Sequence, residues 1–104
     1  IDNKKLIGSL HQWASINDQI ANLYLELGDP DSAIEMVNRG IKMCREHDSL
    51  FLLDELYLCL GRCYIAKDQQ ADAKQALEIA KSLSIARHGT LMEEDIETEL
   101  AKLQ

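Results

Sequence analysis

The 104-residue chain is poor in proline, glycine, aromatic residues and basic residues, and each shortage excludes a class of protein. One proline and five glycines are too few for a disordered or collagen-like chain. Eleven basic residues stand against eighteen acidic ones, which gives a net charge of -7. This charge would repel a phosphate backbone, so we expect no nucleic-acid binding by this segment. The remaining composition is that of an ordinary globular domain.

Long apolar runs and a disulfide framework are also missing. The longest apolar runs, such as residues 50–53, extend for only a few positions, whereas a bilayer span needs about 20. We therefore expect no membrane contact, no leader sequence and no anchor in this segment. Three cysteines, an odd number, favour reduced thiols. These features predict a cytoplasmic protein, with the nucleus as the alternative.

What the sequence does contain is an internal repeat. A shift of forty residues places Tyr24 on Tyr64, and a second shift places Leu56 on Ile96. The unit therefore begins a third time before the chain ends. We predict a single domain over residues 1–104, either whole or a piece of a longer array. Its parts are repeat 1 at 9–48, repeat 2 at 49–88 and a closing half repeat at 89–104.

Within each unit, apolar residues recur at steps of three and four, the period of an amphipathic helix. Gly28 can close one helix, and Asp29-Pro30 can open the next. In the second unit, register alone places the turn at residues 68–71. The pattern predicts an all-α protein without strands, whose helices lie at about 4–27, 31–47, 50–67, 71–86 and 91–103.

The first helix has one continuous apolar stripe. It consists of Leu6, Leu10, Trp13, Ile16, Ile20, Leu23 and Leu27. Trp13, the single tryptophan, is expected in a core or an interface rather than in a ligand platform.

The repeat resembles the tetratricopeptide repeat in a long form, with a period near forty. In both units, large, small and aromatic residues are followed by small, large and small ones in the family's order. They are Ile20, Ala21, Tyr24, Ala33, Val37 and Gly40, then Leu60, Gly61, Tyr64, Ala73, Leu77 and Ala80. The resemblance implies antiparallel helical hairpins that stack into a short right-handed α-solenoid with a closing helix. Small residues such as Gly61 are expected where paired helices touch.

The resemblance also implies a groove on the concave side of the stack, lined by the first helix of each hairpin. Carried over position by position, the groove residues are Ser15, Asp18, Asn22, Leu25 and Glu26, then Glu55, Leu58, Cys59, Arg62 and Ile65, and on the closing helix Asp95, Thr98 and Lys102. Asn22 resembles the family's asparagine that holds the main chain of a peptide. Asp18, Glu26 and Glu55 stand where a carboxylate clamp would need basic side chains, so we reject that mode.

These features predict a protein-interaction scaffold, not an enzyme. Its acidic groove, with an apolar floor of Leu25, Leu58 and Ile65, would bind a basic or amphipathic peptide or protein segment. Self-association through an exposed end of the array is also expected. An alternative is a peptide-sensing regulatory domain, because the unit is also similar to the pheromone-binding repeats of Gram-positive transcription regulators.

A metal-binding or catalytic protein is the least favoured alternative. Cys59 and Cys63 lie one helical turn apart, and Cys44 precedes His47 by three residues, but the loop-borne CxxC spacing of zinc sites is missing. We therefore predict no metal, no cofactor and no catalytic residue. An acidic cluster is interpreted as a solvated face near a helix N-terminus. It consists of Glu93, Glu94, Asp95, Glu97 and Glu99.

Overall fold

The computed structural model describes residues 3–50, 52–88 and 93–103, and these residues contain helices and no strand. The helices are α1 (Asn3–Glu26), α2 (Pro30–Glu46), α3 (Leu53–Ala66), α4 (Gln70–His88) and α5 (Glu93–Ala101). The predicted number and order of helices are confirmed. The largest difference is at the start of α3, predicted at residue 50 and observed at Leu53.

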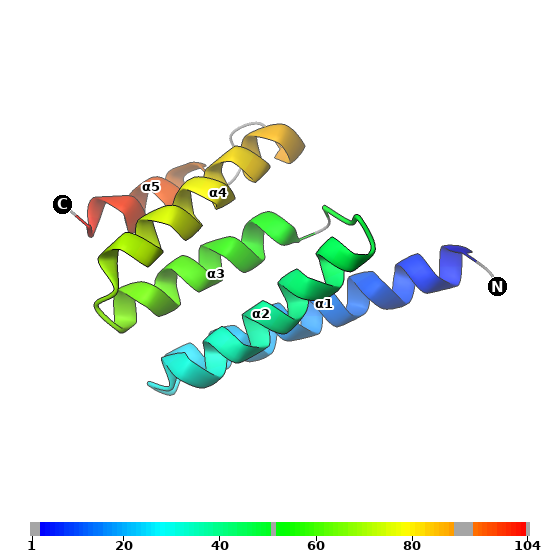
Figure 1. The fold of residues 1–104 in the computed structure, drawn as a ribbon, viewed down its shortest axis with the longest axis horizontal. Helices are drawn as coiled ribbons and strands as arrows, with labels where there is room; N and C mark the ends of the chain where they lie inside the picture. The colour runs from blue at the N-terminus through cyan, green and yellow to red at the C-terminus, as the bar shows by residue number, and fades with distance from the viewer. Residues whose placement is uncertain (1–2, 51, 89–92, 104) are drawn as a thin grey trace.

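The helices stack in chain order, with α1 at one end of the array and α5 beside α4 at the other (Figure 1). Helices α1 and α2 form one antiparallel hairpin and α3 and α4 form the next, while α2 contacts α3 and α4 contacts α5. Helix α3 also contacts both α1 and α5. The fold is an all-α repeat solenoid, as predicted. In the described ranges, no helix combines the length and apolar character that a bilayer crossing requires.

The turns inside the two hairpins share one backbone geometry. Gly28 (φ 80°) and Asp68 (φ 58°) occupy the left-handed position after their helices. The next amide along the chain donates to the carbonyl of Tyr24 in the first hairpin (2.9 Å) and of Tyr64 in the second (2.8 Å). Aspartate can replace glycine in this conformation because its short polar side chain tolerates positive φ. The register of forty residues therefore extends to the hydrogen bonds of the turns.

The residues at the start of α2 explain why a new helix begins there. Asp29 caps the helix, and its Oδ1 accepts a hydrogen bond from the Ser32 amide (3.1 Å). Pro30 occupies the first turn, where a backbone N–H would have no acceptor within the helix, so the lack of an N–H in proline costs no hydrogen bond. The hydrogen bonds from Ser32 hold the pKa of the Asp29 carboxyl below its usual value.

Small residues lie where helices approach closely, both within a hairpin and between neighbouring hairpins. A Cβ atom at Gly61 would lie 2.5 Å from Cδ2 of Leu77, well inside van der Waals contact. At Gly40, the corresponding atom would lie 3.1 Å from Cδ2 of Leu56. Leu56 and Leu77 are both fully buried. The expected close contact at Gly61 is therefore confirmed.

Of the apolar stripe predicted for the first helix, only Leu10 belongs to the buried face, and the side chain of Leu6 lies outside the described residues. Among the described side chains of α1, the buried ones are Leu10, Ala14, Asn17 and Ala21. Trp13 is 56% exposed, and Ile16, Leu23 and Leu27 are also exposed. The other described helices leave these four side chains uncovered. The interpretation of Trp13 as a core residue is wrong, and its assignment to an interface stays a prediction.

Candidate functional site

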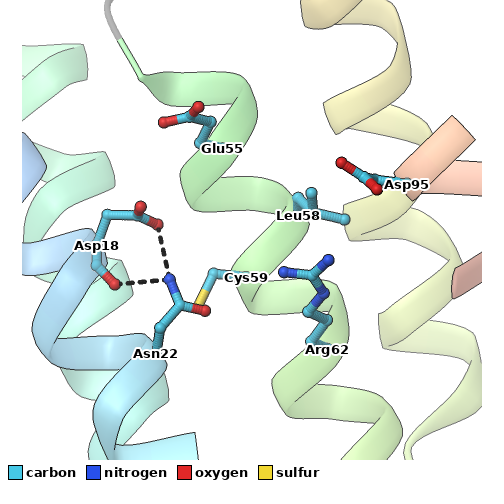
Figure 2. Close-up of a pocket in the computed structure, with 7 residues that line it drawn as sticks. All are labelled: Asp18, Asn22, Glu55, Leu58, Cys59, Arg62 and Asp95. Atoms are coloured by element: carbon cyan, nitrogen blue, oxygen red, sulfur yellow. Dashed lines mark hydrogen bonds between the residues drawn. The ribbon is translucent and has the colours of Figure 1, made fainter. Parts of the chain in front are cut away.

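Three helices that are distant in sequence enclose a cleft of about 230 Å³. The cleft is small enough to hold the end of one side chain. Figure 2 shows the side chains that surround it: Asp18 and Asn22 from α1, Glu55, Leu58, Cys59 and Arg62 from α3, and Asp95 from α5. All of them belong to the groove predicted from the sequence.

Helix periodicity explains this convergence. Asp18 and Asn22 lie one turn apart on α1, and Glu55 and Arg62 lie two turns apart on α3, so each pair shares a helix face. Because α3 contacts both α1 and α5, its face closes the cleft from the centre of the array. Asp95 lies in the first half of α5 and completes the opposite wall.

Asp18 and Asn22 form a polar pair on the α1 wall. The Asn22 amide nitrogen donates to the backbone carbonyl of Asp18 (2.9 Å) and, at longer range, to Asp18 Oδ1 (3.5 Å). The amide oxygen of Asn22 lies on the side of the Cys59 thiol (Figure 2). Asn22 therefore uses its donor group inside the helix and presents an acceptor toward the cleft.

The Asp18 carboxyl is in an environment that disfavours its charge. Partial burial raises its pKa from 3.8 to about 6, the charge of Glu55 adds to the rise, and Asp54 contributes a smaller amount in the same direction. The Arg62 guanidinium opposes these effects but does not cancel them. The cleft therefore contains unbalanced negative charge at neutral pH.

The one basic side chain of the cleft, Arg62, is paired with a carboxylate outside the cleft. Its Nε donates to Oε1 of Glu99 on α5 (3.3 Å). The second oxygen of Glu99 accepts from Lys102 Nζ (3.0 Å). The Glu99 side chain is only 9% exposed, and Ile96 beside it on α5 is fully buried. This network attaches α5 to α3 and offsets the Arg62 charge.

The network corrects the interpretation of the acidic cluster as a solvated face. Glu99 is buried and paired, and Glu97 pairs with Lys81 of α4 (2.5 Å). The interpretation does describe Glu94, Asp95 and Glu97, which are exposed. The side chain of Glu93 lies outside the described residues.

Cys59 lies at the back of the cleft and is almost fully buried. The hydrogen bond that its thiol makes with Cys63, together with burial, holds the pKa of Cys59 above its usual value. Cys59 is therefore a neutral thiol at physiological pH. Within the described part of the chain, His, Cys, Asp and Glu side chains form no group of three or more that could hold a metal ion.

The other predicted groove residues do not line the cleft. Leu25 and Ile65 are half-buried against the core. Of the apolar floor expected from Leu25, Leu58 and Ile65, only Leu58 lines the cleft. Ser15 accepts a hydrogen bond from Gln19, and Glu26 is exposed. On α5, the Thr98 hydroxyl donates to the Glu94 carbonyl. Lys102, which follows α5, pairs with Glu99.

Sequence reasoning missed two carboxylates that influence the site, Glu99 and Asp54. Both are buried, and Asp54 contributes to the raised pKa of Asp18. The repeat register relates both positions to residues that the structure shows to be buried. Glu99 lies forty residues after Cys59 and Asp54 lies forty residues after Ala14, and Cys59 and Ala14 are buried as well.

We expect Asp18→Asn to stabilise the fold at pH 7 and to have little effect at pH 4. The raised pKa means that the folded state binds the Asp18 proton more tightly than the unfolded state does. Ionisation of Asp18 therefore does not destabilise the folded state below pH 3.8. The loss of stability grows between pH 3.8 and about 6 and reaches its full value above about pH 6. Thermal melts across this range should show a gain of a few degrees that appears only as the pH rises.

The matched control is Glu78→Gln, which removes an exposed carboxylate of α4. Its effect on the melting temperature should be smaller than that of Asp18→Asn at pH 7. An equal gain from both variants, or a gain from Asp18→Asn that does not change with pH, would contradict the assignment of the raised pKa to Asp18.

Comparison with known families gives one match. Residues 14–47 match the family described as tetratricopeptide repeat, a stretch with the length of one repeat, about 34 residues. The matched residues fall within the range expected for repeat 1, and they include the second half of α1 and all of α2. No curated protein and no solved structure matches the chain. The match therefore identifies a tetratricopeptide repeat at residues 14–47 of the chain.

Proposed function

We propose that the chain is an interaction scaffold that holds a basic side chain of a partner peptide in the cleft between α1, α3 and α5. Tetratricopeptide repeats generally serve in protein–protein interaction. The observation that carries the proposal is the convergence of three carboxylates, Asp18, Glu55 and Asp95, from three helices. A lysine or arginine of a partner would meet all three at once.

The electrostatics of the cleft favour a cation over an anion. Arg62 contributes one positive charge, but Glu99 outside the cleft already pairs with it at 3.3 Å. The raised pKa of Asp18 reports repulsion from Glu55 in addition to burial. A bound ammonium or guanidinium group would relieve this repulsion, so binding should lower the pKa of Asp18.

The size of the cleft limits what it can hold. A volume of about 230 Å³ accommodates one side-chain end, whereas sites for whole small ligands usually exceed about 300 Å³. The rest of a peptide would therefore lie along α1 and α3, where the Asn22 oxygen can accept from a main-chain N–H. A single positively charged residue would therefore anchor the peptide.

The test is selection of a random peptide library, displayed on phage, against the purified chain at low salt. We expect enrichment of lysine or arginine. For a synthetic peptide of the selected sequence, Glu55→Gln should weaken binding about 5–10-fold because it removes one charge facing the cation. Affinity should also fall with added salt, and below about pH 6, where Asp18 takes up a proton.

Glu78→Gln again provides the control, since its exposed carboxylate lies on α4, outside the cleft. It should leave the affinity for the same peptide unchanged. Enrichment of acidic or uncharged peptides would contradict the proposal. So would equal losses of affinity from Glu55→Gln and Glu78→Gln.

A further inference from the structure

A second surface of the chain is apolar and lies apart from the cleft. It is the α1 stripe, which consists of Trp13, Ile16, Ile20, Leu23 and Leu27. These residues follow one another at steps of three and four, so they form one face of the helix over four turns. Leu27 follows the last residue of α1, and its amide still donates to the Leu23 carbonyl (3.0 Å). Except for the half-buried Ile20, all of them are exposed.

The next repeat shows what such a face does in this fold. Forty residues later, the positions of Trp13, Ile16, Ile20 and Leu23 are occupied by Leu53, Leu56, Leu60 and Cys63, and all four are buried. The fifth position, that of Leu27, is occupied by the exposed Lys67. The four buried residues lie on α3, which packs against α2 of the preceding hairpin. The face equivalent to the α1 stripe is therefore a helix-packing face, and on α1 no helix of the described chain covers it.

The arrangement of the stripe suits a second copy of itself. Ile20 lies at its centre, with Trp13 and Leu27 seven residues away on either side. In an antiparallel pair with a two-fold axis at Ile20, Trp13 would lie against Leu27 of the partner subunit, and Ile16 against Leu23 of the partner subunit. The largest side chain would thereby meet the most exposed one, since Leu27 is 79% exposed.

The charges along α1 permit this pairing although the chain carries -7 overall. Gln12 and Gln19 flank the stripe and are exposed and neutral. Glu26 is the acidic residue that borders it on the same side. In the antiparallel arrangement, the two Glu26 residues lie about 18 Å apart along the helix axes, beyond the screening length of about 8 Å at physiological salt.

The exposed area matches what a weak dimer requires. Trp13, Ile16, Leu23 and Leu27 together expose on the order of 450 Å² per copy, estimated from their exposed fractions and typical side-chain areas. Two copies would bury at most roughly 900 Å², just below the about 1,000 Å² that specific interfaces reach, so the association would be weak. We propose that the chain forms an antiparallel homodimer through the α1 stripe, with a dissociation constant on the order of micromolar.

This interface would leave the cleft open. Asp18 and Asn22 lie about half a helical turn from Ile16 and Ile20, so the α1 stripe and the cleft occupy different faces of α1. Dimerisation and peptide binding are therefore separate proposals, and failure of one leaves the other standing. A dimer would present two clefts to a partner.

Sedimentation of the whole chain from about 1 to 300 µM tests the proposal. The mass should rise from 11.8 kDa toward twice that value, and added salt should favour the rise by screening the net charge. Trp13 is the single tryptophan, so its emission should shift to shorter wavelength over the same concentrations as its ring becomes buried.

Leu23→Glu should abolish both changes, and Leu50→Glu provides a closely matched control. The two leucines are equally exposed, at 57%, and Leu50 lies before α3, outside the stripe. Both variants should keep the helical circular dichroism of the parent because neither side chain is buried. A chain that stays at 11.8 kDa throughout, or a dimer lost with Leu50→Glu but not with Leu23→Glu, would overturn the proposal.

The antiparallel orientation has its own test. Two single variants, Ile16→Cys and Leu23→Cys, are mixed and oxidised with oxidised glutathione. An antiparallel pair brings position 16 of one copy near position 23 of the other, so the mixed disulfide should form faster than either homodisulfide. Preferential formation of the two homodisulfides would show a parallel pair instead and would overturn the two-fold arrangement about Ile20.

Discussion

Gly61→Leu is expected to lower the melting temperature by about 5–15 °C. The Cβ atom alone would lie 2.5 Å from Leu77 Cδ2, and Leu77 is fully buried, so neither side chain has space to move. Overpacking of this kind costs about 1–3 kcal/mol or more. Replacing a helical glycine regains about 1 kcal/mol of helix propensity. The packing loss is the larger effect, and each kcal/mol corresponds to about 4–8 °C in a domain of this size.

Thermal melts followed by circular dichroism would measure the change. Asn38→Leu is the control, because it also places leucine in a helix but at an exposed position of α2. We expect the control to melt within a few degrees of the parent. If Gly61→Leu melted at or above the parent temperature, the close contact between α3 and α4 would be wrong, and so would the groove register derived from it.

Leu77→Ala is expected to have a still larger effect, a loss of about 2–5 kcal/mol in the free energy of unfolding. Leu77 is fully buried where α4 packs against α3, and the truncation leaves a cavity beside Gly61. Small domains have a total stability of about 5–15 kcal/mol, so the variant should be partly unfolded at much lower urea concentrations than the parent. A loss below about 1 kcal/mol would contradict the packing.

The two sites should also couple. In the parent, Gly61→Ala introduces a Cβ that meets Leu77, and we expect it to destabilise. In the Leu77→Ala background the space is open, so the same change should be neutral or stabilising through helix propensity. Urea unfolding of the four proteins forms a double-mutant cycle, with an expected coupling of at least about 1 kcal/mol. Additive effects would show that residues 61 and 77 do not touch.

The repeat register explains what could be predicted from the sequence. Because each unit repeats its apolar steps, the helices and their pairing follow from local periodicity and the turn at Gly28. The cleft was predictable for the same reason. Asp18, Glu55 and Asp95 occupy nearby positions on the first helix of successive units, and stacking of like helices brings such positions together.

The periodicity of apolar residues could not predict which face of α1 is covered by other helices. An apolar stripe shows that a face can be buried, but it does not show whether a neighbouring helix is present. Trp13 and Leu23 therefore looked like core positions and are exposed. The buried face of α1 is formed instead by residues such as Ala14 and Ala21, whose small size permits the close approach of α2.

The ion-pair partners of charged residues also could not be predicted from the sequence. Glu99 belongs to a sequence cluster of acids, and such clusters are usually solvated. Its burial depends on Arg62, which lies 37 residues earlier on another helix. Only the folded arrangement of α3 and α5 brings the two together, so no local pattern could indicate the pair.

Because α5 is short, we expect the α5 wall of the cleft to open locally in solution. Its nine residues are fewer than an isolated helix needs to persist in water, about 12–15. It is held in place by Ile96 in the core and by the Glu99 network, so local opening of α5 would remove Asp95 while Asp18 and Glu55 stayed in position. A cation bridging Asp95 to the other two would oppose that opening. Amide hydrogen exchange of α5 is therefore a direct gauge of cleft occupancy.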